Sequence, residues 1–454
     1  MTVVTVILAA GQGTRMKSDL AKVLHPVGGK PMVLRAVEIA AQVSDLQPIV
    51  VVGRDADTVR AVLGDKAHCV LQAEQLGTGH AVLQATEALK DKADTVVVFY
   101  ADMPLLRPET LRELIALRAD DKATLSLLSV IEDDPRGFGR VVRNDGGNTV
   151  QKIVEERECT PAQKLIKELN AGVYAFEGRW LWDSLASLRP QSNGEYYLTD
   201  LVEHANVVGG SVVGLQIQDK DEVIGINTRV HLSEAEAALR RRINRGWMLD
   251  GVTIIDPATT YIHEDAVIGQ DTVILPNTQI WGKTEIGIHG IIGPNTVIHD
   301  SKIGAHCAVE ASTVEGATLE DHVDIGPYAH LRKGAYLCRG VHMGNFGEVK
   351  NSRLGPNTKM GHFSYIGDSE IGEDVNLGAG VITVNFDGVR KHKTVIGDHA
   401  FIGSDSMLIA PIKVDNDART AAGSVVTKNV PEGHIAIGVP ARMRKITPLN
   451  SASE

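Results

Sequence analysis

The chain has 454 residues, more than a single hydrophobic core usually serves, so two or three domains are expected. A net charge of −11 argues against a general role in binding nucleic acid or a membrane surface, and we expect neither as a partner. The four cysteines show neither CxxC pairing nor metal-like spacing, which indicates reduced thiols. With no cleavable leader and no apolar run of transmembrane length, the sequence predicts a soluble cytoplasmic protein.

The first half alternates strand-like and helix-like segments. The β-prone apolar segments are residues 2–10, 48–53, 95–100 and 123–130, and the helical segments are residues 31–41, 56–63, 79–88 and 108–117. Such alternation predicts an α/β doubly wound sheet with mostly parallel strands. Ligands of this fold class gather at the carboxyl ends of the strands. The residues that follow each strand are therefore the candidates for a site.

A glycine-rich turn, LAAGQGTRM at residues 8–16, follows the first strand. Its glycines let backbone N–H groups approach phosphate oxygens, and Arg15 adds a bidentate cation. The turn is neither a Walker loop nor a dinucleotide fingerprint, because both patterns fail here. Lys22 follows the turn, and Asp102 stands just after a buried strand. An aspartate in that place is suited to bind Mg²⁺, although it could instead cap the turn before Pro104.

A single helix over residues 229–250 is predicted to connect the two halves. From Ile262 to Val414 an aliphatic residue recurs at every sixth position, with occasional five-residue steps. This period matches neither a helix nor strand alternation and indicates a parallel β-helix of hexapeptides, in which aliphatic side chains stack inward as a ladder. A β-sandwich would not hold this phase over so many repeats. We expect domains at residues 1–228 and 251–454, the second with a polar tail after Lys445.

Polar residues interrupt the hexapeptide pattern between Leu331 and Leu408. They are Arg332, Lys350, His362, Tyr365, Asn376 and Asn385. An irregular excursion at residues 385–394 lies in the same stretch, and a long loop in a regular fold usually serves a function. Imidazole suits proton transfer near neutral pH. Because the fold alone proves no chemistry, this polar cluster is what predicts a second site.

The chain resembles the sugar-phosphate nucleotidylyltransferases and, more narrowly, the bifunctional N-acetylglucosamine-1-phosphate uridylyltransferase/glucosamine-1-phosphate N-acetyltransferase family. Besides the glycine-rich turn, the motifs that carry the resemblance are QAEQLGTGHA (72–81), YADMPL (100–105), GFGR (137–140), KIVEE (152–156), NAGVY (170–174) and GINTR (225–229). The resemblance covers nearly the whole chain, since that family also has a C-terminal left-handed parallel β-helix of hexapeptide repeats.

The resemblance implies two reactions. The β-helix would acetylate glucosamine-1-phosphate with acetyl-CoA. The N-terminal domain would then transfer UMP from UTP to N-acetylglucosamine-1-phosphate, giving UDP-N-acetylglucosamine and pyrophosphate for cell-wall and lipopolysaccharide precursors. Mg²⁺ as cofactor and a homotrimer are also implied.

Carried over by position, the resemblance implies a UTP site in which Arg15 and Lys22 act on the phosphates. The implied UTP-binding residues are Leu8, Ala9, Ala10, Gly11, Gly13, Lys22, Gln72, Gly77 and Thr78, the last three of which would read uracil. The implied sugar contacts are Gly139, Glu155, Asn170 and Asn227, and Asp102 and Asn227 would bind Mg²⁺. Taken without the resemblance, Glu155 could be a surface carboxylate and the two asparagines could be caps.

In the β-helix the resemblance implies that His362 is the general base, with Glu348 as a candidate to orient it. The implied amino-sugar and phosphate contacts are Arg332, Lys350, Tyr365 and Asn376, and those of acetyl-CoA are Ala379, Asn385, Phe386, Ser404 and Ala422. Taken alone, His362 is one of 16 histidines, and Arg332 and Lys350 could be mere surface charges.

Three positions depart from the family pattern. Ala21 replaces the proline before Lys22, Phe386 replaces a tyrosine, and the arginine that the family has near Gly438 lacks an obvious match. Arg442 or Lys445 could contact the CoA phosphates instead. Two other functions are possible. A single-function nucleotidylyltransferase with a scaffold β-helix would have no use for the polar cluster. A non-catalytic regulatory protein would have no use for Arg15, Lys22, Asp102 and Asn227.

Overall fold

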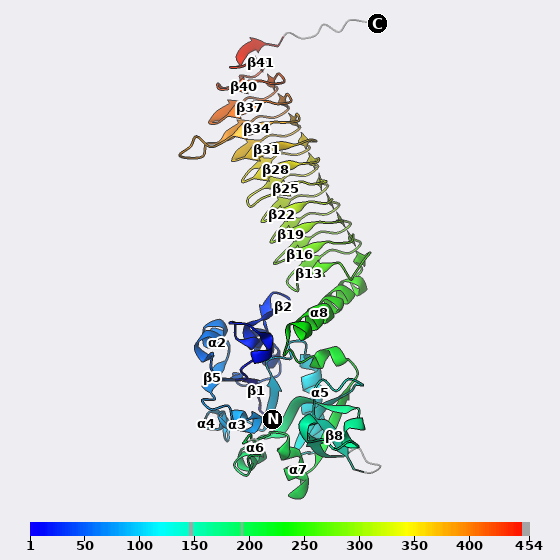
Figure 1. Cartoon of the computed structure of the whole chain (residues 1–454). Coiled ribbons are helices and arrows are strands. Elements are labelled where there is room, and N and C mark those ends of the chain that lie inside the picture. The colour runs from blue at the N-terminus through cyan, green and yellow to red at the C-terminus, as the bar shows by residue number, and fades with distance from the viewer. Residues whose placement is uncertain (145–148, 192–193, 447–454) are drawn as a thin grey trace. The chain divides into compact units, whose positions relative to one another are not determined.

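A computed structural model describes residues 1–144, 149–191 and 194–446 (Figure 1). The chain forms two compact units, Met1–Leu239 and Arg240–Glu454. Helix α8 (Arg229–Leu249) contains the position where one unit ends and the next begins. The predicted domain limits stay a prediction, and the predicted polar tail lies from residue 447 onward outside the described residues. Within the described ranges, no helix is long and apolar enough to cross a membrane.

The first unit is built on one mixed sheet. Its strand order is β11 (Val212–Ile217), β7 (Leu125–Ile131), β10 (Glu168–Glu177), β6 (Thr95–Tyr100), β1 (Val3–Ala9), β4 (Ile49–Val52) and β5 (His68–Leu71). Neighbours run parallel except for β10, which is antiparallel to both β6 and β7. An antiparallel pair, β8 (Arg140–Arg143) and β9 (Val150–Val154), extends from β10. The predicted doubly wound, mostly parallel sheet is confirmed.

Helices cover both faces of this sheet. One core contains residues of α1 (Met32–Ala40), α2 (Ala56–Leu63) and α5 (Pro108–Asp120). The other contains residues of α3 (Thr78–Leu83), α4 (Thr86–Leu89), α6 (Gly178–Leu185) and α7 (Asp200–Val207). Strand β1 sends alternate residues into the two cores, which explains its uninterrupted apolar sequence.

The single helix predicted over residues 79–88 is wrong, because the structure divides it into α3 and α4. The side-chain amide of Gln84 donates to the His80 carbonyl oxygen at 3.0 Å, the acceptor that the Gln84 backbone N–H would use in a continuous helix. That backbone N–H bonds instead to Ala81, three residues back, and Ala85 bonds likewise to Val82. The chain tightens at this point and the helix ends.

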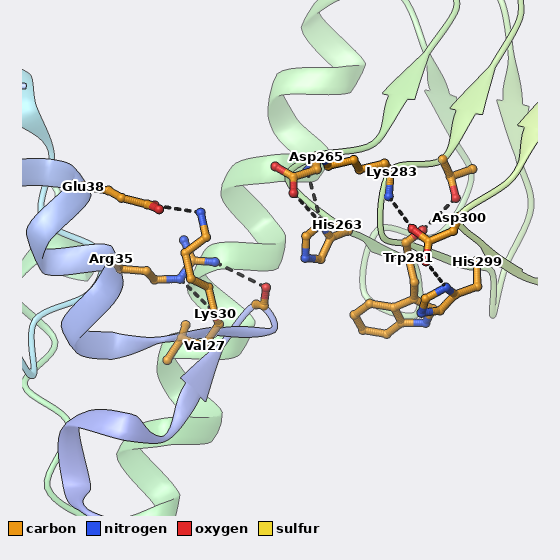
Figure 2. Close-up of polar contacts among 12 residues, drawn as sticks. Val27, Lys30, Arg35, Glu38, His263, Asp265, Trp281, Lys283, His299 and Asp300 are labelled. Carbon is orange, nitrogen blue, oxygen red and sulfur yellow. Dashed lines mark hydrogen bonds and ion pairs between the residues drawn. The ribbon is translucent and has the colours of Figure 1, made fainter. Parts of the chain in front are cut away.

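A short hairpin follows the 3-10 turn Lys22–Leu24 and is fixed on α1 (Figure 2). It consists of β2 (Pro26–Val27) and β3 (Lys30–Pro31). The buried Arg35 of α1 donates from Nε to the Val27 carbonyl oxygen at 2.6 Å. Lys30 pairs with Glu38 of the same helix at 2.7 Å. These contacts anchor the segment that carries Lys22.

The second unit is a parallel β-helix with three faces (Figure 1). A 12-stranded sheet runs from β12 (Thr253–Ile254) to β42 (Arg442–Lys445), a 10-stranded sheet from β13 (Tyr261–Ile262) to β40 (Val425–Val426), and a 9-stranded sheet from β14 (Val267–Ile268) to β38 (Ile412–Val414). Along almost the whole unit each strand pairs in parallel with the third strand after it, so three strands make one coil. The predicted hexapeptide β-helix is confirmed.

The aliphatic ladder occupies the interior of the coils. Ile262, Ile280 and Ile298 lie in register on successive coils, and each is at most 5% exposed. Two inward positions escaped the periodic pattern. Val314 lies between Ile298 and Leu331 in register, where the sequence steps by five. Thr383 is fully buried, and its hydroxyl is satisfied by the backbone of Gly367 on the coil below. A threonine fits the ladder there because its polar atom has a partner.

The C-terminal part of α8 closes the first coil of the ladder. Ile243 and Trp247 pack against the aliphatic core. Between them, Asn244 is fully buried and its amide donates at 3.0 Å to the carbonyl oxygens of Pro257 and Thr260. These two bonds join the helix to the loop of the first coil.

Polar side chains also close the corners of the coils. At one corner, shown in Figure 2, Asp300 accepts from the Lys283 backbone N–H at 2.9 Å and lies 2.9 Å from His299 Nδ1. The carboxylate thereby links a corner to the corner of the preceding coil.

Candidate active sites

The first unit contains a cleft with a volume of about 460 Å³. Its walls begin at the carboxyl ends of β1 and β6, where a fold of this class places ligands. The predicted residues that line it are Leu8, Ala9, Ala10, Gly11, Lys22, Gln72, Gly77, Thr78, Asp102, Gly139, Glu155, Asn170 and Asn227. Residues from segments far apart in the sequence thus meet in one cavity.

Lys22, Asp102 and Asn227 converge at one point of the cleft. The Lys22 ammonium lies 2.5 Å from Asp102 Oδ2 and 3.1 Å from Asn227 Oδ1. The Lys22 and Asp102 side chains are only 12% and 14% exposed, so the pair is largely screened from water. Two oxygen atoms from distant segments therefore face a single cation. A carboxylate oxygen and an amide oxygen are ligands that Mg²⁺ accepts, and Mg²⁺ commonly takes few protein ligands and completes its shell with water and phosphate.

Asp102 and Asn227 therefore fit the small number of protein ligands that Mg²⁺ commonly takes. Among the described residues there is no cluster of three or more His, Cys, Asp or Glu side chains suited to enclose a metal. A metal held here would take its protein oxygens from Asp102 and Asn227, the two atoms that now face the Lys22 ammonium.

The glycine-rich turn presents mainly backbone to the cleft, through Ala10 and Gly11. Gly13 has a positive φ of 63°, and a Cβ on it would lie 2.5 Å from Lys22 Cβ, so only glycine lets the turn approach Lys22 this closely. Arg15 lies in the 3-10 turn Thr14–Met16 and is exposed. Neither Gly13 nor Arg15 lines the cleft, and their phosphate-binding roles stay predictions.

The start of α3 forms another part of the cleft wall. Gly77 precedes this helix with a φ of 98°, and a Cβ there would lie 2.6 Å from the Tyr196 carbonyl oxygen. The Thr78 hydroxyl accepts from the Leu198 backbone N–H at 3.0 Å. Gln72 follows β5, is 4% exposed, and donates to the Gly77 carbonyl oxygen at 3.0 Å. A buried, fixed amide of this kind can select a base by its hydrogen-bonding edge.

Asn170 and Glu155 form a third wall. The Asn170 amide donates to the Tyr174 hydroxyl at 2.7 Å, and its oxygen accepts from the Gly172 backbone N–H at 3.1 Å, within a bulge of β10. Glu155 accepts from the Thr199 hydroxyl at 2.9 Å. Burial raises the pKa of Glu155 above its ordinary value, and nearby acidic groups add to the shift although the Thr199 bond opposes it.

Several residues of the cleft were not predicted as site residues. Gln75 donates to the Ala10 carbonyl oxygen at 2.7 Å and thereby joins the segment before α3 to the glycine-rich turn. Tyr100 lines the cleft, and burial raises the pKa of its hydroxyl well above the ordinary value. Both lie within motifs visible in the sequence. Thr199 lies 44 residues from Glu155, and nothing local to it signals the contact.

In the second unit, cations gather on the outer side of the 10-stranded sheet. Arg332 follows β25 (His330–Leu331), and Lys350 ends β28 (Gly347–Lys350). Lys391, which was not predicted, lies beside Lys350. A side-chain hydrogen bond with Lys391, followed by like-charge repulsion from Lys391 and Arg332, lowers the pKa of Lys350. Arginine and lysine side chains gathered in this way can bind an anion such as a phosphate monoester, and Glu348, Glu315 and Asp368 are the carboxylates that act on them.

Glu348 is the carboxylate that pairs with Arg332. It lies on β28 beside Tyr365 in register and accepts from Arg332 at 2.8 Å. The structure therefore uses it to orient Arg332, and its predicted role beside His362 stays a prediction.

Tyr365 and Asn385 lie together above Gly367. A Cβ on Gly367 would lie 2.5 Å from the Tyr365 hydroxyl and 2.7 Å from the Asn385 amide nitrogen. The Asn385 amide donates to Asp368 Oδ2 at 2.5 Å, and Asn385 itself is 7% exposed. Two predicted site residues from successive coils thus meet at one spot because the residue between them has no side chain.

His362, Ala379, Ser404 and Ala422 occupy the same corner of four successive coils. Each lies between a strand of the 12-stranded sheet and the next strand of the 10-stranded sheet. Backbone bonds join the levels: Gly380 to Phe363 at 2.7 Å, Asp405 to Ala379 at 2.7 Å, and Gly423 to Ser404 at 2.8 Å. His362 is exposed, so its imidazole is open to a bound substrate. Ala379, Ser404 and Ala422 form a line of small residues on the three coils that follow the coil of His362.

The remaining predicted residues lie around this corner. Asn376 is on β33 (Asn376–Leu377) of the 12-stranded sheet, between Lys359 and Phe401 in register. The excursion after β34 (Ile382–Val384) protrudes from the β-helix in Figure 1. It closes as a hairpin through a bond of 2.7 Å from the His392 N–H to the Asn385 carbonyl oxygen, and Phe386, which is 56% exposed, pairs with Lys391 across it.

Arg442 and Lys445, near the C-terminus, were named in the sequence as possible contacts of the CoA phosphates. Arg442 and Lys445 lie at the two ends of β42, and both are exposed. Gly438 sits before them with a positive φ of 92°. Their contacts with the CoA phosphates stay predictions.

Comparisons with known proteins match the two units of the chain to two different family models. Residues 5–168 match the MobA-like NTP transferase domain, and residues 393–428 match the hexapeptide repeat of succinyl-transferase. The chain is similar to the bifunctional protein GlmU of Brevibacillus brevis, with 44% identity over 99% of this chain and 97% of that protein. Its counterparts from Exiguobacterium sibiricum (46% identity, 97% and 98% covered) and Caldicellulosiruptor saccharolyticus (47% identity, 95% and 94% covered) match equally fully. The chain belongs to the family of bifunctional GlmU proteins.

Proposed function

We propose that the chain catalyses two consecutive reactions in separate units. The β-helix acetylates glucosamine-1-phosphate with acetyl-CoA. The N-terminal unit transfers UMP from UTP to the resulting N-acetylglucosamine-1-phosphate and releases pyrophosphate. The product is UDP-N-acetylglucosamine.

In uridylyl transfer the sugar phosphate attacks the α-phosphate of UTP in line with the leaving pyrophosphate. The chain's part is to position both reactants and to neutralise charge, so no covalent intermediate is needed. Gln72, Gly77 and Thr78 hold the uracil, and Glu155 and Asn170 hold the sugar. Lys22 stabilises the negative charge at the α-phosphate. Asp102 and Asn227 would hold Mg²⁺, which when bound adds positive charge at the phosphates.

In acetyl transfer the 2-amino group of the sugar attacks the thioester carbon. His362 accepts a proton from the nitrogen as the new C–N bond forms, and the C–S bond breaks to release CoA thiolate, which takes up a proton. Arg332, Lys350 and Lys391 hold the sugar's phosphate, and Tyr365 and Asn376 orient the ring. Asn385 and Phe386 contact the acetyl end of the donor, and the small residues at positions 379, 404 and 422 leave room for the pantetheine arm.

The observation that carries the proposal is the meeting of Lys22, Asp102 and Asn227 in the same cleft as the fixed amide of Gln72. A nucleotide base at one end and phosphates at the other would span these two features. The test is a pair of assays on the full chain. Pyrophosphate should form from UTP and N-acetylglucosamine-1-phosphate. Thiol should appear from acetyl-CoA only when glucosamine-1-phosphate is added and with UTP absent. Thiol release that fails while pyrophosphate still forms would mean that the β-helix is a scaffold.

Three further properties belong to the same proposal. The chain acts in the cytoplasm, where its substrates and reduced thiols are found. It assembles as a homotrimer, which light scattering would show as three times the chain's mass. Residues 1–228 form the uridylyltransferase domain, residues 229–250 the connecting helix, and residues 251–454 the acetyltransferase domain.

A further inference from the structure

The side chain of Gln72 has two partners behind the cleft wall. Its amide nitrogen lies 3.0 Å from the Gly77 carbonyl oxygen and 3.1 Å from His80 Nδ1. Gln72 lines the cleft, whereas His80, one turn into α3, does not. His80 therefore touches the residue that faces the ligand without facing the ligand itself.

The Gly77 carbonyl determines the orientation of the Gln72 side-chain amide. A backbone carbonyl oxygen can only accept, and this one also accepts from the Ala81 N–H at 3.1 Å. If the Gln72 amide were turned over, two oxygens would face each other at hydrogen-bond distance in a buried site. The nitrogen of Gln72 thus points inward and uses both hydrogens within the protein. The oxygen, which can only accept, is left for the cleft.

This arrangement requires a particular state of His80. Its Nδ1 must carry no hydrogen in order to accept from Gln72, so the neutral ring carries its hydrogen on Nε2. The Gln84 amide nitrogen lies 3.2 Å from Nε2, but it also donates to the His80 carbonyl oxygen at 3.0 Å. A neutral imidazole has one acceptor nitrogen. We assign this acceptor to the buried Gln72, because Gln84 is half-buried and already donates to the His80 carbonyl oxygen.

We propose that His80 is a positioning residue that sets the nucleotide preference of the uridylyl-transfer site. By accepting the second hydrogen of Gln72, it leaves only an acceptor facing the base. That acceptor favours a pyrimidine whose N3 carries hydrogen, as uracil does, and disfavours cytosine, whose N3 has a lone pair. The inference rests on the proposed uridylyl transfer.

The test compares UTP with CTP as nucleotide substrates of the full chain, measuring kcat and KM for each. In His80→Leu the second hydrogen of the Gln72 amide loses its acceptor, so a rotation that keeps the bond to the Gly77 carbonyl can offer that hydrogen to the cleft. The ratio of kcat/KM for UTP to that for CTP should fall about fivefold, the size expected for one hydrogen bond, through a higher KM for UTP at unchanged kcat. His80→Asn places a carbonyl oxygen near the Nδ1 position and should restore the ratio. Gln84→Ala should leave it unchanged.

A wild-type ratio in His80→Leu would overturn the inference. So would equal losses with both nucleotides in His80→Leu and His80→Asn, which would indicate a merely structural role. Acetyl transfer by the same preparations reports whether the chain is intact. If wild type forms no pyrophosphate from UTP, the proposed function itself fails; if wild type is active and only the variant pattern is missing, the inference about His80 fails alone.

Discussion

A methyl group on Gly367 should damage acetyl transfer selectively. In Gly367→Ala the new Cβ would lie 2.5 Å from the Tyr365 hydroxyl and 2.7 Å from the Asn385 amide, whereas real Cβ contacts essentially never fall below 3.0 Å. The hydroxyl must then move by at least about 0.5 Å and the amide by about 0.3 Å. Gly367 has no left-handed backbone angle, so the substitution adds crowding without backbone strain.

Displacements of this size in groups that orient a substrate reduce rates by about tenfold to a hundredfold. We expect kcat/KM for acetyl transfer to fall by that factor, measured as thiol release with glucosamine-1-phosphate. Pyrophosphate formation by the same protein should keep its wild-type rate. Gly290→Ala is the matched control, because its Cβ would meet its nearest neighbour at an ordinary 3.4 Å. Unchanged acetyl transfer in Gly367→Ala would show that Tyr365 and Asn385 do not orient the substrate.

Three other predictions concern the two sites, the start of the β-helix and the excursion at residues 385–394. Asp102→Asn should lower uridylyl transfer by at least about a hundredfold and spare acetylation, while His362→Ala should do the reverse; loss of both activities in either variant would contradict independent sites. Asn244→Ala removes two buried hydrogen bonds, so urea unfolding of the β-helix should show a free energy lower by about 2 kcal/mol, and an unchanged midpoint would refute this. Bonds from the Arg390 backbone, the His392 ring and the Val389 backbone lower the pKa of Asp387 from 3.8 to about 2. Because the folded pKa is the lower one, this stabilisation is complete above pH 4 and disappears toward pH 2. Amide exchange at positions 389 and 390 should accelerate over that range beyond its intrinsic pH dependence, and Asp387→Ala should abolish the difference.

The ladder of the β-helix was predictable because a single physical demand repeats along the chain. The inward-pointing residue of each face must be apolar, and the inward-pointing residues of consecutive faces are usually six positions apart in the sequence. Thr383 did not follow the rule, since its burial depends on a hydroxyl bonded to the coil below. Val314 was missed for a simpler reason, namely two consecutive five-residue steps around it.

The cleft of the first unit was predictable where its residues lie in local motifs next to strand ends. Gln72, Asp102 and Asn227 belong to this group. The pairing of Lys22 with Asp102 could not be read from the sequence, because the two residues are 80 positions apart and meet only through the fold of the chain between them. The division of the 79–88 helix had a local cause, but a glutamine competing for a backbone acceptor leaves no distinctive pattern. Lys391 belongs to a run of basic residues, and only the hairpin of the excursion brings it beside Lys350.

The strict register of the β-helix makes its length adjustable in whole coils. Val273 pairs with Ile291, so excising residues 273–290 would join Thr272 to Ile291 and let the strands below and above the cut pair directly. Every remaining side chain would keep its face, and the stack would become shorter by one strand spacing, about 4.8 Å. Removing five residues instead would turn aliphatic side chains outward along a face. Gene segments encoding one coil are therefore the natural increments by which a protein of this design can grow or shrink.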